Sequence, residues 1–149
     1  MALSVSGFLA LIDNALDQLT ANRENDVLTI KLDQIALIKA RIQQQGLDYQ
    51  GTAFPPYTPA YARTRKNAGY QVGYVDLTRT GATLASLIPV ITESSIFAAS
   101  ATIEPGNAES AKIIRGLEVK RPGITVPTKD ELRFSEEANG FRWRKYFNF

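Results

Sequence analysis

"DVLTIKLDQIALIKARIQQQG", residues 26–46, carries the clearest helical pattern in this chain. Apolar side chains recur along it at helical spacing, at Leu28, Leu32, Ile35, Ile38 and Ile42. Asn25 or Asp26 is a suitable N-cap, and Gly46 stands where a glycine commonly ends a helix. The stretch therefore predicts an amphipathic helix from about residue 26 to residue 45, around which a core can form.

A second helical pattern precedes it in "GFLALIDNALDQLT", residues 7–20. Its apolar positions are Phe8, Leu11, Ile12, Ala15, Leu16 and Leu19. Asp13 and Asp17 lie on the other face of such a helix. The polar "NREND", residues 22–26, separates the two patterns. Because this connection is short, residues 1–46 are expected to form an antiparallel helical hairpin.

Residues 47–75 show little periodicity and are rich in glycine and proline. Each of Pro55, Pro56 and Pro59 lacks a backbone donor and biases the residue before it away from a helix. A structureless loop of this length in a compact domain usually has a function or a partner. We therefore expect residues 47–75 to be an extended docking loop.

Residues 76–149 are expected to be a mixed strand and helix region. A short helix carrying Leu84 and Leu87 is predicted, with Gly81 at a positive φ in the turn before it. "IPVITES" and "SIFAASATIE", residues 88–94 and 95–104, alternate in the manner of two antiparallel strands joined through residues 93–95.

The last third of the chain predicts three further elements. A helix is expected from Asn107 to Arg115, ended by Gly116, and then a short strand from Ile124 to Val126. Pro127 and Thr128 precede acidic residues and indicate a helix start or a turn. The expected fold class is α+β, in a single domain over residues 1–149.

Composition excludes several kinds of chemistry. The chain has 149 residues, no cysteine and no histidine, so Ser–His–Asp and Cys–His catalysis cannot occur. No glycine-rich phosphate-binding motif is present and the carboxylates are dispersed. We therefore expect no enzymatic activity, no cofactor and no metal. No apolar run is long enough to span a bilayer, so we expect no membrane partner and synthesis in the cytoplasm.

Basic and aromatic residues gather in two places. Arg63, Arg65 and Lys66 follow Tyr57 and Tyr61, and the chain ends in "FRWRKYFNF", with five rings in nine residues. Rings and cations of this kind can stack on bases and bind phosphates. They are also typical anchors of protein interfaces, and some of the rings can simply close the core. The residues leave these three interpretations open.

"FPPYTPAYARTR", residues 54–65, is the most unusual stretch. As a ligand for an SH3-like domain it offers only one PxxP with a basic flank, Pro56 to Pro59, and this is a weak match. Together with "VDLTRTGATLASL", residues 75–87, it resembles the tail-completion and virion-morphogenesis proteins of tailed bacteriophages. The residues that carry the resemblance are Pro56, Tyr57, Thr58, Pro59, Tyr61, Ala62 and Arg65 in the first part and Asp76, Leu77, Thr78, Thr80, Gly81, Leu84 and Ser86 in the second.

The resemblance covers roughly residues 30 to 135. Toward its end the chain departs from the family, because it has no histidine and only Arg121–Pro122 in place of the family's usual motifs. The resemblance implies a non-enzymatic structural subunit of the virion, which joins the head connector to the tail as part of a ring of identical subunits. Its other neighbours would be the tail terminator or tail tube, and DNA would only pass through the lumen.

The expected interface residues have rigid rings as anchors and arginines as a polar rim. They are Pro55, Pro56, Tyr57, Pro59, Tyr61, Arg63, Arg65, Trp143, Tyr146, Phe147 and Phe149. Two alternatives remain. One is another neck subunit, such as a tail terminator. The other is a nucleic-acid-binding accessory protein that uses Arg63, Arg65, Lys66, Arg142, Arg144 and Lys145.

Overall fold

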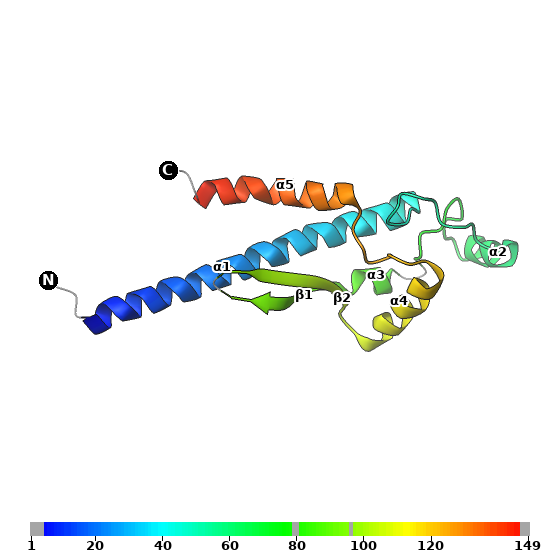
Figure 1. The fold of residues 1–149 in the computed structure, drawn as a ribbon. Helices are drawn as coiled ribbons and strands as arrows, with labels where there is room; N and C mark the ends of the chain where they lie inside the picture. The colour runs from blue at the N-terminus through cyan, green and yellow to red at the C-terminus, as the bar shows by residue number, and fades with distance from the viewer. Residues whose placement is uncertain (1–4, 79–80, 96, 147–149) are drawn as a thin grey trace.

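The fold is organised around one long helix, α1 (Val5–Ala40). In the computed structural model, which describes residues 5–78, 81–95 and 97–146, a hairpin of β1 and β2 lies along one side of α1 (Figure 1). Helix α5 (Lys129–Tyr146) runs antiparallel along the other side. The remaining elements gather near the C-terminal end of α1. The predicted α+β class is confirmed.

The expected helical hairpin over residues 1–46 is wrong, because α1 continues through "NREND" without a break. None of these five residues is a proline or glycine, so each costs a helix well under about 1 kcal/mol. Tertiary contact supports the helix here, since the Ser94 hydroxyl at the end of β1 donates a hydrogen bond to Glu24. A π-helical turn, Arg41–Gln45, follows α1.

Gly46 ends this helical segment, as predicted, with a φ of 67°. A Cβ atom at this position would lie 2.8 Å from the Tyr74 ring. Both the left-handed backbone and the close approach of Tyr74 therefore require glycine.

The two predicted strands are confirmed as β1 (Leu87–Ser94) and β2 (Ala99–Pro105), an antiparallel pair. The register places Leu87 opposite Pro105 and Val90 opposite Thr102, with an irregularity between Ile91 and Glu93. Burial alternates along β2, as the sequence predicted. The connecting turn lies slightly later than expected, because the Ser95 N–H donates to the Ala98 carbonyl over 2.8 Å.

Two helices connect the hairpin to the core. Helix α3 (Ala82–Ala85) precedes β1, and α4 (Ala108–Lys120) follows β2. Asn107 caps α4, since its side chain accepts from the Ser110 N–H over 2.8 Å. The prediction that Gly116 ends this helix is wrong. Ile114 and Leu117, on either side of it, both pack in the core and hold the helix together there.

The predicted strand at Ile124 to Val126 is also wrong. This segment is a turn, in which the Glu118 carboxylate accepts from the backbone N–H groups of Gly123, over 2.6 Å, and Thr125, over 3.2 Å. The predicted helix start is confirmed, since Thr128 and Glu131 cap α5 reciprocally.

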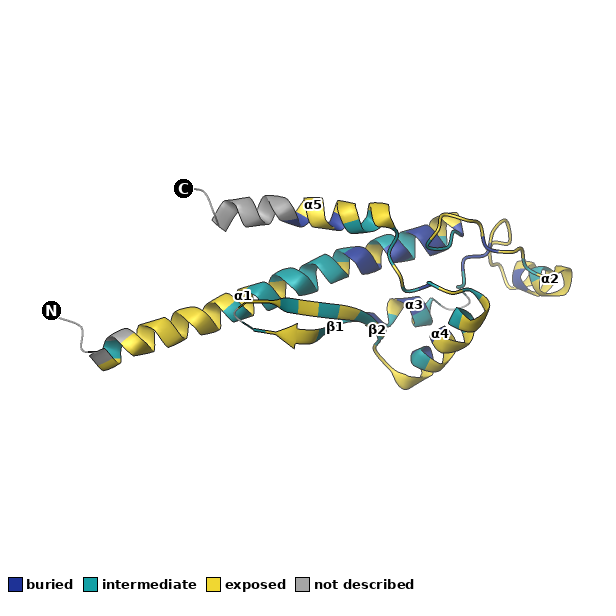
Figure 2. Ribbon diagram, in the orientation of Figure 1, coloured by how far each residue is buried: buried dark blue, intermediate teal, exposed yellow. Residues whose placement is uncertain are grey.

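The hydrophobic core lies at the C-terminal end of α1, and Figure 2 shows the burial concentrated there. Its buried side chains are Ile35, Ile38, Ile42, Phe54, Val75, Leu84, Leu87, Ile114 and Ile124. Polar contacts join helix α5 to α1 and to the π-helical turn that follows it. The Gln34 amide donates to the Ser135 hydroxyl over 3.1 Å, and Arg41 Nε lies 3.1 Å from Glu131 Oε1.

Candidate docking site

The proline-rich segment contains a helix that the sequence reasoning missed. Helix α2 (Pro59–Asn67) begins inside the expected docking loop, so residues 47–75 are not extended throughout. Thr58 caps it by accepting from the Tyr61 N–H. Pro59 occupies a first-turn position, where a helix needs no backbone donor. A threonine followed by a proline was therefore the signal for a helix start.

We call residues 54–65 and 75–87 the two parts of the motif. Arg65, on α2, is buried against the second part. It is 4% exposed, and its Nη2 lies 2.9 Å and 3.0 Å from the two carboxylate oxygens of Asp76. Its Nε donates to the Gln71 carbonyl over 3.2 Å and its Nη1 to the Thr78 carbonyl over 2.6 Å. A buried guanidinium requires a charged partner and satisfied donors. Arg65 therefore fixes α2 to the segment 71–78.

Tyr57 completes this arrangement. Its hydroxyl donates to Asp76 Oδ1 over 2.8 Å and accepts from the Asp76 N–H over 3.2 Å. The guanidinium of Arg65 lies 4.7 Å from the centroid of the Tyr57 ring, and Tyr61 meets that ring edge-on at 5.3 Å. We call Tyr57, Arg65, Asp76 and Thr78 the Asp76 cluster. It joins the two parts of the motif by direct contact.

Tyr57 and Asp76 have pKa values shifted away from neutrality. Burial, reinforced by the hydrogen bond to Asp76, raises the pKa of Tyr57 to about 12. Burial also opposes the charge on Asp76, but hydrogen bonds from the Thr78 N–H and Tyr57, with the positive charge of Arg65, outweigh it and lower the pKa of Asp76. Neither group exchanges protons near pH 7. The cluster is suited to holding the backbone in place rather than to acid–base catalysis.

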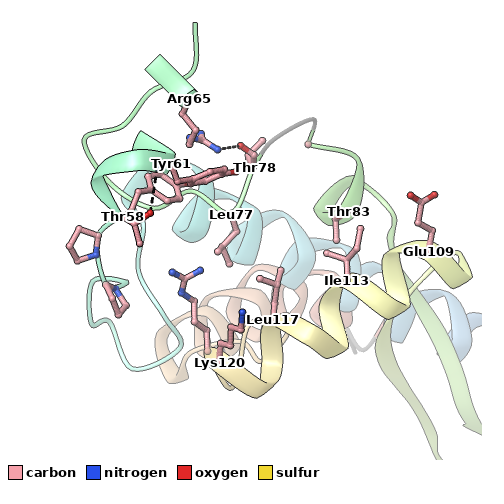
Figure 3. A pocket seen from close by; sticks show the side chains of 15 residues that line it. Thr58, Tyr61, Arg65, Leu77, Thr78, Thr83, Glu109, Ile113, Leu117 and Lys120 are labelled. Atoms are coloured by element: carbon pink, nitrogen blue, oxygen red, sulfur yellow. Dashed lines mark hydrogen bonds between the residues drawn. The ribbon is translucent and has the colours of Figure 1, made fainter. Parts of the chain in front are cut away.

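Leu77 carries the strain of this arrangement. It has a φ of 51°, in the left-handed region that a leucine rarely adopts. The backbone is held there by Thr78, whose N–H donates to Asp76 Oδ1 and whose hydroxyl donates to the Asp76 carbonyl, each over 2.9 Å. Strain of this kind costs about 1–3 kcal/mol and persists only where neighbouring contacts impose it. Here it directs the Leu77 side chain toward Leu117 on α4 (Figure 3).

An open pocket of about 900 Å³ lies between the motif and α4 (Figure 3). Its volume is within the range typical of ligand sites. The motif supplies one wall with Pro55, Pro56, Tyr57 and Tyr61, and Leu77 projects from the next segment. The other wall is α4 and the residue after it, with Glu109, Ile113, Leu117, Lys120 and Arg121.

The expected interface residues divide into three groups. Pro55, Pro56, Pro59, Tyr61 and Arg63 are exposed on the surface of the motif. Tyr57 is half-buried and Arg65 is buried, so the expectation of an exposed polar rim is wrong for Arg65. At the C-terminus, Trp143 and Tyr146 lie within helix α5, whereas Phe147 and Phe149 lie outside the described residues. The structure therefore brings together only the first part of the expected set.

Sequence reasoning missed the α4 wall of the pocket and the role of Asp76. Asp76 belonged to the motif, but it was not assigned to the site. The signal for it was the need of a buried arginine for an acidic partner. The wall residues Ile113, Leu117 and Lys120 follow a helical period, and such a pattern does not reveal which segment of the chain faces them.

Comparison with protein families, with curated proteins and with solved structures finds no match to this chain. No helix within the described part of the chain is long and apolar enough to cross a membrane. Across residues 5–78, 81–95 and 97–146, no group of acidic side chains is arranged to hold a metal ion. The geometry of the pocket therefore carries the functional argument.

Proposed function

We propose that this chain is a non-enzymatic structural subunit of a tailed-phage particle, which joins the head connector to the tail within a ring of identical subunits. One observation carries the proposal. Two motif segments that are separate in the sequence meet through Asp76, which contacts Tyr57 and Arg65. Together they form one wall of an open pocket.

The motif residues divide by burial into two sets. Tyr57, Arg65 and Asp76 hold the shape of the segment, whereas Tyr61 and Arg63 are presented on its surface. A surface that is fixed before binding loses less conformational entropy on association. This division is suited to a docking surface for a neighbouring subunit or the connector. We propose that the chain is assembled in the host cytoplasm and resides in the virion.

A nucleic-acid-binding role has weaker support. Arg63 and Lys66 are exposed on α2, but Arg65 is neutralised by Asp76 and is not available to a phosphate. Of the three basic residues near Tyr57 and Tyr61, only Arg63 and Lys66 are therefore available to a phosphate. DNA binding that weakens steeply with salt would favour the nucleic-acid role over the structural one.

The proposal is tested in a phage that encodes this chain, with the exposed pair replaced by Tyr61→Ala and Arg63→Ala. We expect the purified variant to keep its circular dichroism spectrum while heads and tails accumulate unjoined in electron micrographs. Tyr57→Ala is unsuitable for this purpose because Tyr57 holds Asp76.

The matched control is Arg133→Ala, an exposed arginine on α5, away from the pocket. This control should give normal particles. A normal yield of infectious particles from the Tyr61→Ala and Arg63→Ala variant would contradict the proposed function.

A further inference from the structure

The N-terminal part of α1 carries apolar side chains that its own chain does not cover. Every residue from Leu9 to Leu19 is exposed, in the part of α1 that projects beyond the hairpin (Figure 2). The large aliphatic side chains among them are Leu9, Leu11, Ile12, Leu16 and Leu19. We call residues 9–22 the arm. A stripe of this kind on a helix normally packs against a partner surface.

The arm is acidic along one edge. Asp13 and Asp17 are one helical turn apart and flank the stripe formed by Ile12 and Leu16. Residues 9–22 contain no lysine or arginine. If two arms packed against each other, they would bring acidic edges together, which opposes association. The charge pattern instead favours a partner that is apolar and has a basic margin.

The pocket beside the Asp76 cluster has this character. Leu77, Ile113 and Leu117 give it an apolar surface, and Lys120 and Arg121 stand together at one end of α4. Arg121 is held in place, since its guanidinium lies 5.4 Å from the centroid of the Phe54 ring. Glu109 lies at the other end of α4, so the basic margin is confined to one end of the pocket.

The arm and the pocket lie at opposite ends of the molecule (Figure 1). One copy of the chain therefore cannot fill its own pocket with its own arm. A contact between the arm of one copy and the pocket of the next is head-to-tail, and repetition of such a contact closes into a ring or continues as a filament.

We infer that the pocket binds the arm of a neighbouring copy, as an amphipathic helix laid in an apolar groove. The arm's aliphatic stripe packs on Leu77, Ile113 and Leu117, and its aspartates face Lys120 and Arg121. This inference rests on the ring of the proposed function and specifies the interface from which that ring is built.

Cysteine cross-linking tests the contact directly, because the chain contains no cysteine of its own. Leu16→Cys is placed on the arm and Ile113→Cys on the α4 wall, both at exposed positions. Under mild oxidation of the full-length protein, we expect the double variant to form disulfide-linked dimers, trimers and larger species. We also expect an equimolar mixture of the two single variants to form dimers.

The single variants provide the matched controls. Each alone should stay uncross-linked. Efficient dimers from Leu16→Cys alone would show arm–arm packing and would overturn the inference. The absence of cross-links in both the double variant and the mixture, at the highest concentration that keeps the protein in solution, would also overturn it.

A charge exchange provides the second measurement. Asp13→Lys with Asp17→Lys should weaken self-association, measured by analytical ultracentrifugation, by about tenfold or more, because like charges then meet at Lys120. Lys120→Glu in the same chain should restore part of the self-association, and a failure to restore any would count against the inference.

Particle assembly is scored separately from self-association. If the arm–pocket contact fails in a chain that still joins heads to tails, the proposed function stays intact. Cross-linked oligomers in a chain that phage assembly does not need would overturn only the proposed function.

Discussion

The two ends of α1 have similar apolar patterns and different surroundings. Near its C-terminal end, Ile35 and Ile38 are buried in a core that also contains residues from distant parts of the chain, such as Phe54, Leu84 and Ile114. Near its N-terminal end, Leu9 is 54% exposed and Leu16 is 38% exposed. Helical periodicity identifies the apolar face of a helix. It does not indicate whether that face is covered by the same chain or by another one.

This difference separates residues that stabilise the fold from residues that are available for assembly. Substitutions at the core end should alter the free energy of unfolding of a single chain, whereas substitutions on the arm should alter association. The Asp76 cluster lies at the core end and also shapes one wall of the pocket, so damage to it should affect both properties.

The largest effect is expected for Arg65→Ala. This change leaves the buried Asp76 carboxylate without its charged partner and removes the bonds to the Gln71 and Thr78 carbonyls. Breaking a buried pair by removing one partner costs about 3–5 kcal/mol in the free energy of unfolding. Urea denaturation measures it. Arg63→Ala, at an exposed position on the same helix, should change this free energy by less than about 0.5 kcal/mol, and equal midpoints for the two variants would refute the role given to Arg65.

A pair of substitutions on α1 tests the contrast between its two ends. Ile38 is completely buried, so Ile38→Ala should lower the free energy of unfolding by about 2–5 kcal/mol. Leu16→Ala should change it by no more than about 0.5 kcal/mol when measured at a concentration where the chain is monomeric. A large loss for Leu16→Ala under those conditions would mean that the arm packs within its own chain.

Two glycines at the core end should respond with opposite signs. Gly81 has a φ of 77° with ordinary space around a Cβ atom, so Gly81→Ala should cost about 1–2 kcal/mol through backbone strain alone. Gly116 lies inside α4 with nothing near its Cβ position, so Gly116→Ala should stabilise the chain by about 0.5–1 kcal/mol. Thermal denaturation of both variants checks the signs, and destabilisation by Gly116→Ala would be inconsistent with the helical course of α4.

The smallest effect concerns pH. Folding raises the pKa of Tyr57 from about 10 to about 12, so the fold favours the neutral phenol. The stability from this preference is complete below about pH 10 and is lost as the pH rises toward about 12. Denaturation series across this interval should show a steeper loss for the wild-type protein than for Tyr57→Phe. Parallel curves would mean that Tyr57 is not held by Asp76 in solution.

The sequence predicted the elements whose patterns are local. The helix from Leu28 onward, the alternation in β2, the positive φ of Gly81 and the start of α5 are confirmed. Of the predicted apolar stripe, Ile35, Ile38 and Ile42 are buried, whereas Leu32 is exposed. Each depends on spacing or on a single residue's conformational preference, and both can be read from the chain.

The incorrect predictions concern boundaries that tertiary contacts decide. The helix does not break near Glu24 because the hairpin packs along it. Helix α4 continues past Gly116 because Ile114 is buried in the core and the partly buried Leu117 packs against that core. The segment around Ile124 has strand-like residues, but the side chain of Glu118 binds its backbone, and no strand in the described part of the chain pairs with it. The same limit applies to the site. The motif was identified from its local sequence, whereas the α4 wall of the pocket was not, because tertiary contacts bring that wall to the motif.

The unbroken course of α1 sets a fixed distance within the molecule. Its 36 residues extend over about 54 Å, and this length sets how far the arm lies from the pocket that its own chain carries. In a head-to-tail assembly this distance sets the spacing between successive copies, and together with the rotation at each contact it determines the size of the circle that closes. Removing seven residues after the arm would shorten the reach by about 10 Å and turn the aliphatic stripe by only about 20°. Such a deletion would retain the contact and change the diameter of the assembly, whereas a deletion that turns the stripe away would abolish the contact.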